Sequence, residues 1–196
     1  MPLDTRLAPI VSAVWAAFPD APPPALDSAS PWPEVASAAS EIGGFSWRTA
    51  PGAVLDAVHD ALPWLDAASF VYWLPGLLID LVADPSRAGT RGDDLVLALT
   101  PPRASDLADD RRALDRSRAN GIFDEATHTA AVEQITAWHE RLRTPLFEDR
   151  WSHLTPAQQA AVRDTLEFLA REYARDDAAE AVARWRQADG DRPVPT

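Results

Sequence analysis

The histidines are the first side chains in this sequence that could do acid–base or metal chemistry. Two of the four, His128 and His139, are 11 residues apart within one predicted helix. At about 100° per residue the two rings lie within about 20° in angle but roughly 16 Å apart along the axis, too far to share a metal ion. Position 143, four residues after His139, is an arginine, so the zinc-protease spacing is absent. We expect both histidines to flank the apolar stripe of their helix.

Two acidic clusters could bind Mg²⁺. Residues 176–180 read Asp-Asp-x-x-Glu, which is similar to the magnesium–diphosphate motif of class I terpene synthases, and residues 106–110 carry a mirrored version. That chemistry needs carboxylates one helical turn apart, which bridge Mg²⁺ to phosphate oxygens. Those enzymes need a longer chain to enclose their substrate, and two adjacent arginines neutralise the second cluster. We therefore interpret Asp177 and Glu180 as a pair that caps a helix.

One enzymatic alternative stays open, a small Mg- or Mn-dependent hydrolase or lyase. It requires residues that are far apart in the sequence to converge in space. The candidates for such a site are His128, His139, Asp176, Asp177 and Glu180, of which some would have to come together.

The composition excludes several other chemistries. The chain has 196 residues, no cysteine and a formal net charge of −12, and all 18 of its Lys+Arg residues are arginines. It can therefore form neither a thiolate metal site nor a Schiff base, and it has no Gly-rich nucleotide loop or G-x-S-x-G motif. We predict no catalytic residue, metal or cofactor.

Negative charge repels phosphate backbones, so nucleic acid is not an expected partner. The first residues do not form a signal-peptide pattern, which indicates a cytoplasmic protein.

The acidic residues are unevenly spread. Residues 1–100 carry 12 acids and 4 arginines, whereas residues 101–196 carry 18 and 14. Between residues 26 and 84 there are eight acids and a single arginine, Arg48. Such a patch can steer and bind a basic partner. The candidate partner-binding residues are five of these aspartates and the exposed parts of two tryptophans beside them: Asp56, Asp60, Trp64, Asp66, Trp73, Asp80 and Asp84.

Helical patterns with clear start and stop residues cover most of the chain. The N-cap residues Asp66, Asp124 and Thr155 each precede a long helix, and Gln158 completes a capping box with Thr155. A loop is expected over 84–92, followed by a short element of uncertain type over 93–99. The predicted helices span 5–18, 33–42, 53–61, 66–83, 105–119, 124–143, 155–174 and 177 to about 188.

The segment 66–83 is apolar nearly all round, which is typical of a buried central helix. Its uncharged run, 67–79, has 13 residues, whereas a membrane-spanning helix needs about 20. Pro75-Gly76 is expected to kink this helix or to split it in two. The sequence therefore predicts an all-α fold, one domain over 5–188 with about six to eight helices around a kinked central apolar helix. Residues 189–196 are expected to form a flexible tail.

Three short motifs resemble a family of small bacterial proteins of unknown function. Residues 70–78 fit F-x-Y-x-L-P-x-L-L, residues 154–162 fit L-T-x-x-Q-x-A-A-V, and L-E-F-L follows at 166–169. The similarity covers roughly 7–188. It implies a single α-helical domain and assigns no catalytic residue.

Small size, an acidic half and no catalytic constellation favour a non-catalytic binding protein. The most concrete form of this hypothesis is a bacterial immunity protein or antitoxin. It would neutralise a basic toxin domain by protein–protein binding, without a membrane and without nucleic acid. A regulatory or scaffold protein is the third possibility.

Overall fold

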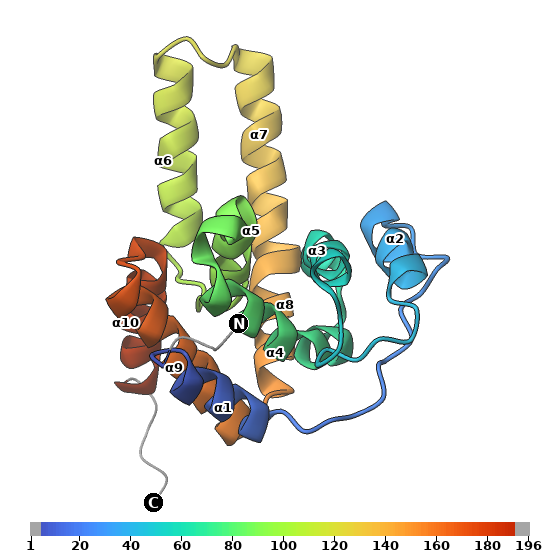
Figure 1. Cartoon of the computed structure of the whole chain (residues 1–196). Coiled ribbons are helices and arrows are strands. Elements are labelled where there is room, and N and C mark those ends of the chain that lie inside the picture. Colours follow the sequence, from blue (N-terminus) through green and yellow to red (C-terminus); the bar gives the residue numbers. More distant parts are fainter. Residues whose placement is uncertain (1–4, 191–196) are drawn as a thin grey trace, which may run out of the picture. The chain divides into compact units, whose positions relative to one another are not determined.

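The chain folds into helices, most of them joined by short connections, with a longer extended connection over 18–32 (Figure 1). The computed structural model describes residues 5–190, and for residues 85–90 and 189–190 it describes the backbone alone. No strand occurs among the described residues, which confirms the all-α prediction. Contacts within the chain group into two compact units. The main unit comprises Met1–Thr100 and Arg150–Thr196, and the hairpin unit comprises Pro101–Asp149.

The helices of the main unit lie close to the predicted ranges in most cases. The predicted starts at Pro33 and Pro156 are confirmed, since both prolines occupy the first turn of a helix. Gly43 and Gly44, at φ values of 52° and 85°, follow the second helix as expected. The elements are α1 (Ala8–Ala17), α2 (Pro33–Glu41), α3 (Gly52–Asp60), a 3-10 turn η1 (Leu62–Trp64), α4 (Ala67–Ala83), α5 (Pro85–Ala98), α9 (Pro156–Glu172) and α10 (Asp176–Gly190).

Helix α4 is the centre of the main unit and packs against α1, α3, α5 and α9. Its predicted N-cap is confirmed, because the Asp66 carboxylate accepts a hydrogen bond from the Ser69 N–H at 2.7 Å. The helix is not divided at Pro75 and continues to Ala83. The largest buried side chains of α4 are those of Phe70, Trp73, Leu74 and Leu78, which supply much of the core.

The prediction for the segment that forms helix α5 is wrong. The predicted loop over 84–92 and the short element over 93–99 form one helix, Pro85–Ala98. Proline is suited to the first position of a helix, and the buried side chains of Leu95, Val96 and Leu99 attach the second half of this segment to the core. Tertiary packing therefore overrides the low helix propensity of its glycines.

The capping box at the start of α9 is confirmed in both directions. The Gln158 N–H donates to the Thr155 hydroxyl at 3.3 Å, and the Thr155 N–H donates to the Gln158 side chain at 2.8 Å. In α10 the predicted position of the cap is wrong, because the helix begins at Asp176 and Asp177 lies inside it. The Asp177 carboxylate still accepts a first-turn N–H, that of Ala178 at 2.9 Å, and it pairs with Arg175 at 2.5 Å. Glu180 pairs with Arg184 at 2.6 Å. Helix α10 also takes in residues 189 and 190 of the predicted tail, and residues 191–196 lie outside the described residues.

The hairpin unit consists mainly of α6 (Asp106–Ala119) and α7 (Glu125–Trp138). Its predicted cap is confirmed, because the Asp124 carboxylate accepts from the Thr127 N–H at 2.7 Å. The predicted end of the second helix at residue 143 is wrong. The chain continues through a π-helical turn η2 (His139–Arg143) into α8 (Thr144–Ser152). Pro145 directly follows this π-helical turn, which is a common way for a continuous helix to accommodate a residue that lacks an N–H.

Among residues 5–190, no helix is both long enough and apolar enough to cross a membrane.

Candidate functional site

An open groove lies between α2 and α3, which run side by side in the main unit (Figure 1). Its volume is about 380 Å³. Each helix contributes four residues to the lining. Helix α2 provides Pro33, Glu34, Ser37 and Glu41, and α3 provides Ala53, Asp56, Ala57 and Asp60.

The lining residues recur at helical spacing, so each set forms one stripe along its helix. On α3 the positions i, i+3, i+4 and i+7 from Ala53 face the groove, whereas Val54, Leu55 and Val58 are buried in the core. On α2 the buried residues are Val35 and Ala38. The amphipathic pattern therefore fixes which face of each helix points toward the groove.

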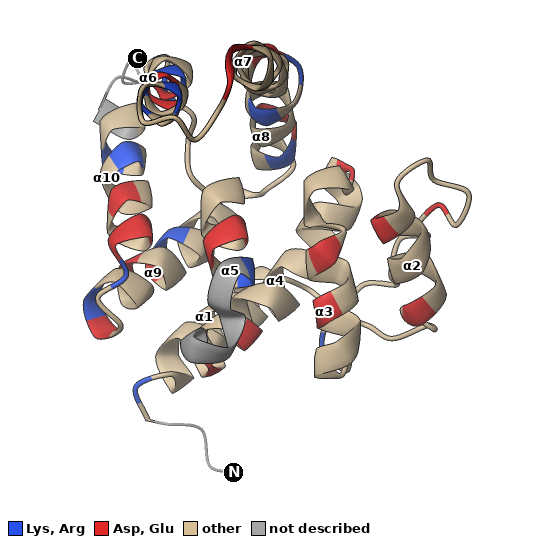
Figure 2. Cartoon of the chain, turned by 90° about the horizontal axis from the view of Figure 1, so that it is seen from above, with Lys and Arg blue, Asp and Glu red and all other residues tan. Residues whose placement is uncertain are grey.

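The groove is acidic and has no basic side chain in its lining. Four of its eight lining residues are carboxylates, and Figure 2 shows acidic positions on both α2 and α3. Alanines and a serine separate them, and these small side chains leave the space open. The groove can therefore accept a cationic group that brings several N–H donors.

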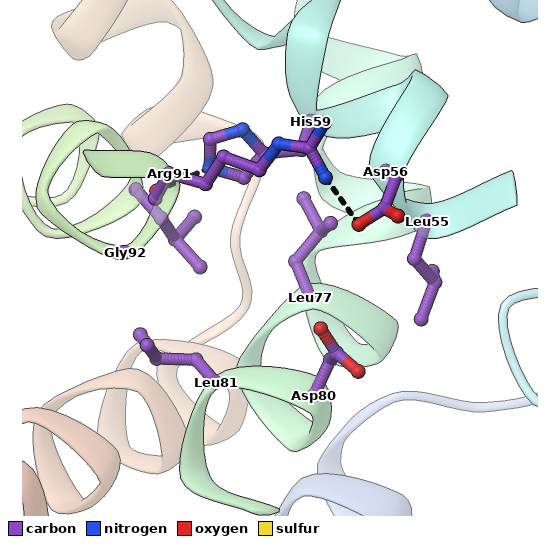
Figure 3. A pocket seen from close by; sticks show the side chains of 9 residues that line it. Leu55, Asp56, His59, Leu77, Asp80, Leu81, Arg91 and Gly92 are labelled. Carbon is purple, nitrogen blue, oxygen red and sulfur yellow. Dashed lines mark hydrogen bonds and ion pairs between the residues drawn. The ribbon is translucent and has the colours of Figure 1, made fainter. Parts of the chain in front are cut away.

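A basic residue from α5, Arg91, reaches the carboxylates of α3, and Figure 3 shows its ion pair with Asp56. The Arg91 guanidinium forms a close ion pair with Asp56 through Nη1. Its Nε lies 3.3 Å from Asp60 Oδ1, and its Nη2 lies 3.4 Å from Asp60 Oδ2. One guanidinium thus bridges two carboxylates that are one helical turn apart.

His59 ties the same residue of α5 to α3. Its Nε2 contacts the backbone carbonyl of Arg91, and because a carbonyl only accepts, Nε2 carries the proton. Burial lowers the pKa of His59 from 6.5, outweighing the hydrogen bond to Arg91 and the nearby carboxylates, which act in the opposite direction. The neutral ring therefore anchors the Arg91 backbone independently of the Arg91 side chain.

A small pocket of about 30 Å³ lies beside this contact and is bounded by α3, α4 and α5. Leu55, Leu77 and Leu81 give it an apolar wall, and Asp56 and Asp80 line it as well (Figure 3). A pocket of this size admits little more than one water-sized group. The larger groove between α2 and α3 is therefore the better candidate for binding.

A second concavity, of about 200 Å³, lies next to α1 and α4. Arg48 is placed over the rings of Trp15 and Trp47, 4.9 and 4.5 Å from their centroids. The same guanidinium donates to the Phe18 carbonyl at 3.0 Å, which satisfies the end of α1. These contacts give Arg48 a structural role in joining α1 to the segment that precedes α3.

A pair of stacked tryptophans joins the start of α2 to the turn after α3. The Trp32 and Trp64 rings are 3.8 Å apart and 8° from parallel. Trp32 directly precedes Pro33, and Trp64 closes the turn that follows Asp60, so the stack joins the helix ends that carry these two groove residues. Trp32 is 44% exposed, so part of its side chain is accessible to solvent at the start of α2.

The structure brings together part of the predicted site. Asp56 and Asp60 line the groove, Asp80 lines the neighbouring pockets, and Trp64 is half-buried in the stack. The expectation that Trp73 has an exposed part is wrong, because its ring is fully buried in the core. The other two members cap α4, Asp66 at its start and Asp84 at its end.

Four residues at this site are not among those predicted from the sequence: Trp32, Glu34, Glu41 and Arg91. A signal for the two glutamates existed, because Glu34, Ser37 and Glu41 are spaced i, i+3 and i+7 on a predicted helix. Arg91 was assigned to a loop, which concealed its position opposite Asp56 and Asp60.

The two histidines of the metal-dependent alternative make contacts with aspartates. His128 Nε2 lies 2.9 Å from Asp115, and His139 Nε2 lies 2.7 Å from Asp110. Within the described part of the chain, no group of three His, Cys, Asp or Glu residues could hold a metal ion. That alternative therefore lacks a ligand set among these residues.

Comparisons of this chain with protein-family models, with curated proteins and with solved structures give no match, so the similarity to small bacterial proteins of unknown function rests on the quoted motifs alone.

Proposed function

We propose that this chain is a non-catalytic binding protein whose α2–α3 groove receives a basic segment of a partner protein. The observation that carries the proposal is the groove itself, with four carboxylates and no basic residue in its lining. In its most concrete form, the protein is a bacterial immunity protein or antitoxin that acts in the cytoplasm and neutralises a toxin domain. A toxin that cleaves nucleic acid needs a basic cleft for phosphates, and an acidic surface can cover such a cleft.

The charge of the whole chain supports the same partner chemistry. A formal net charge of −12 attracts a basic protein from a distance, and a carboxylate-lined groove gives that attraction a place to act. Electrostatic steering raises association rates and is weakened by salt. A regulatory or scaffold protein with a basic partner would use the same groove, and only the partner's activity distinguishes the two functions.

The test is purification of the partner from the native host, followed by a neutralisation assay. The tagged wild-type chain is expected to recover one basic protein that arrests growth when it is expressed alone. Co-expression of the wild-type chain should restore growth. A groove variant with three carboxylates neutralised should fail to restore it: Glu34→Gln, Glu41→Gln and Asp60→Asn.

A matched control removes the same charge from exposed carboxylates elsewhere: Glu133→Gln, Glu148→Gln and Asp164→Asn. This control is expected to restore growth like the wild type, with an association rate that still falls steeply with salt. If both triple variants behave alike, the groove is not the binding surface. A partner whose expression leaves growth unaffected contradicts the toxin hypothesis, and a partner without a basic surface contradicts the proposal as a whole.

A further inference from the structure

We propose that Arg91 is an internal competitor for the groove. In the free protein its guanidinium occupies the two α3 carboxylates, and an arginine of the partner displaces it on binding. The inference rests on the proposed function, which it deepens by assigning arginine as the partner side chain and by placing a regulatory contact at the same site.

A competitor must contact carboxylates that also line the groove, and Arg91 does so. Asp56 and Asp60 are bridged by Arg91 and also line the groove, so one pair of carboxylates serves both surfaces. The side chains of Arg91, Asp56 and Asp60 are 39%, 38% and 54% exposed, so an incoming group can reach them from solvent.

The bridging geometry favours an arginine of the partner over a lysine. Asp56 and Asp60 are one helical turn apart on α3, and the planar guanidinium spans both with separate N–H groups. An ammonium is a compact charge that cannot match this fork. Glu34 and Glu41, on the opposite side of the groove, supply carboxylates for a second donor group.

The existing contact is open to solvent and can be replaced, with a close ion pair to Asp56 and a looser contact to Asp60. The two Arg91–Asp60 distances, 3.3 and 3.4 Å, exceed the roughly 2.7–2.9 Å of a strong charge-assisted hydrogen bond. Exposed ion pairs contribute little to stability, so displacement of Arg91 should reduce the partner's affinity by only about two- to five-fold. The competitor would tune affinity without blocking the groove.

The fold allows the side chain to leave without the helix. His59 contacts the Arg91 backbone carbonyl from α3, and this contact does not involve the guanidinium. Leu95 and Leu99, further along the same segment, are buried in the core. The substitution Arg91→Gln is therefore expected to leave α5 in place and to remove the guanidinium contacts with Asp56 and Asp60.

The experiment measures binding of a fluorescein-labelled hexa-arginine peptide by anisotropy, with the full chain and several variants. Arg91→Gln is expected to bind the peptide about two- to five-fold more tightly than the wild type. The matched control is Arg186→Gln, which also removes one exposed arginine and releases one carboxylate, that of Glu167, 3.0 Å away. This control corrects for the extra negative charge. A hexa-lysine peptide of equal charge should bind the wild type more weakly than hexa-arginine does.

The outcomes distinguish a failure of this inference alone from a failure of the proposed function. If Arg91→Gln binds hexa-arginine no more tightly than Arg186→Gln, Arg91 is not a competitor, and the groove itself is judged by the groove variant. If the groove variant with Glu34, Glu41 and Asp60 neutralised binds as well as the wild type, the proposed groove fails and this inference fails with it. Equal affinities for hexa-arginine and hexa-lysine would overturn the assignment of arginine. Circular dichroism of each variant shows whether the helices are retained.

Discussion

Asp106 and Arg143 form a buried ion pair in the hairpin unit, with Asp106 Oδ2 and Arg143 Nη1 2.7 Å apart. The side chains are only 8% and 10% exposed. The same Asp106 oxygen accepts the Arg103 N–H at 2.9 Å, so one carboxylate both pairs the arginine and fixes the start of α6. Removal of its charge leaves a buried cation without this counterion.

The substitution Asp106→Asn is therefore expected to destabilise the hairpin unit by about 3–5 kcal/mol, because breaking a buried pair from one side costs more than the pair contributes. Hydrogen exchange of the α6 and α7 amides measures the effect. The control is Asp109→Asn on the same helix, which breaks only an exposed pair with Arg112 and should cost about 0–1 kcal/mol. Equal exchange in the two variants would contradict the prediction.

Gly76 allows α4 to approach the segment before α3. A Cβ at this position would lie 3.1 Å from both the Trp47 carbonyl oxygen and Leu55 Cδ2. Gly76→Ala is therefore expected to destabilise the main unit by about 1–3 kcal/mol, the usual range for overpacking. Urea unfolding followed by circular dichroism measures the change.

The opposite substitution at an exposed position of the same helix is the control for Gly76. Ala68→Gly should cost about 1 kcal/mol through helix propensity alone, which would show that alanine is the better residue in α4 where space permits. Stabilisation by Gly76→Ala would show that the backbone contact is not limiting.

The parts of the fold that the sequence predicted correctly depend on local interactions. A cap such as Asp66 or Thr155 acts on an N–H group three residues away, so residue type and spacing suffice. Helix α5 could not be predicted in this way. Its first half contains residues typical of loops, and its helical conformation depends on burial of Leu95 and Leu99 in a core formed by distant segments.

The candidate site shows the same division between local and distant information. The acidic stripe of α3 follows from the spacing of Asp56 and Asp60, which the sequence analysis selected together. The bridge by Arg91 and the stack of Trp32 on Trp64 join residues about thirty positions apart, and no local pattern specifies such pairs. For Trp73 the apolar surroundings indicated the core, and its assignment to a partner surface was wrong.

His59 makes the stability of the main unit depend on pH. Burial lowers its pKa in the folded protein below the ordinary value of 6.5, so the unfolded chain binds a proton more readily. The contribution of His59 to stability is therefore fully present above pH 6.5 and is lost as the pH falls toward the lowered pKa. Acidification from pH 8 to pH 5 is expected to reduce the free energy of unfolding.

The variant His59→Gln isolates this effect, because glutamine can donate to the Arg91 carbonyl and has no charge at any of these pH values. Urea unfolding at intervals from pH 8 to pH 5 should show a smaller loss of stability in the variant than in the wild type. His153→Gln, at an exposed position, should follow the wild type. If His59→Gln and the wild type lose stability equally, His59 does not supply the pH dependence.

The Trp32–Trp64 stack is expected to stabilise α2 more than the rest of the main unit. Helix α2 packs mainly against α3, and the stack adds a contact at the end of the groove where α2 begins. Aromatic pairs contribute about 0.5–1.5 kcal/mol beyond the area they bury. Trp32→Ala should therefore speed hydrogen exchange of the α2 amides roughly two- to twelve-fold, leave exchange in α4 and α9 unchanged, and weaken hexa-arginine binding.

Trp15→Ala, which removes a tryptophan of similar exposure from α1, should leave α2 exchange at the wild-type rate. If both variants speed α2 exchange equally, the stack has no specific role in positioning the groove.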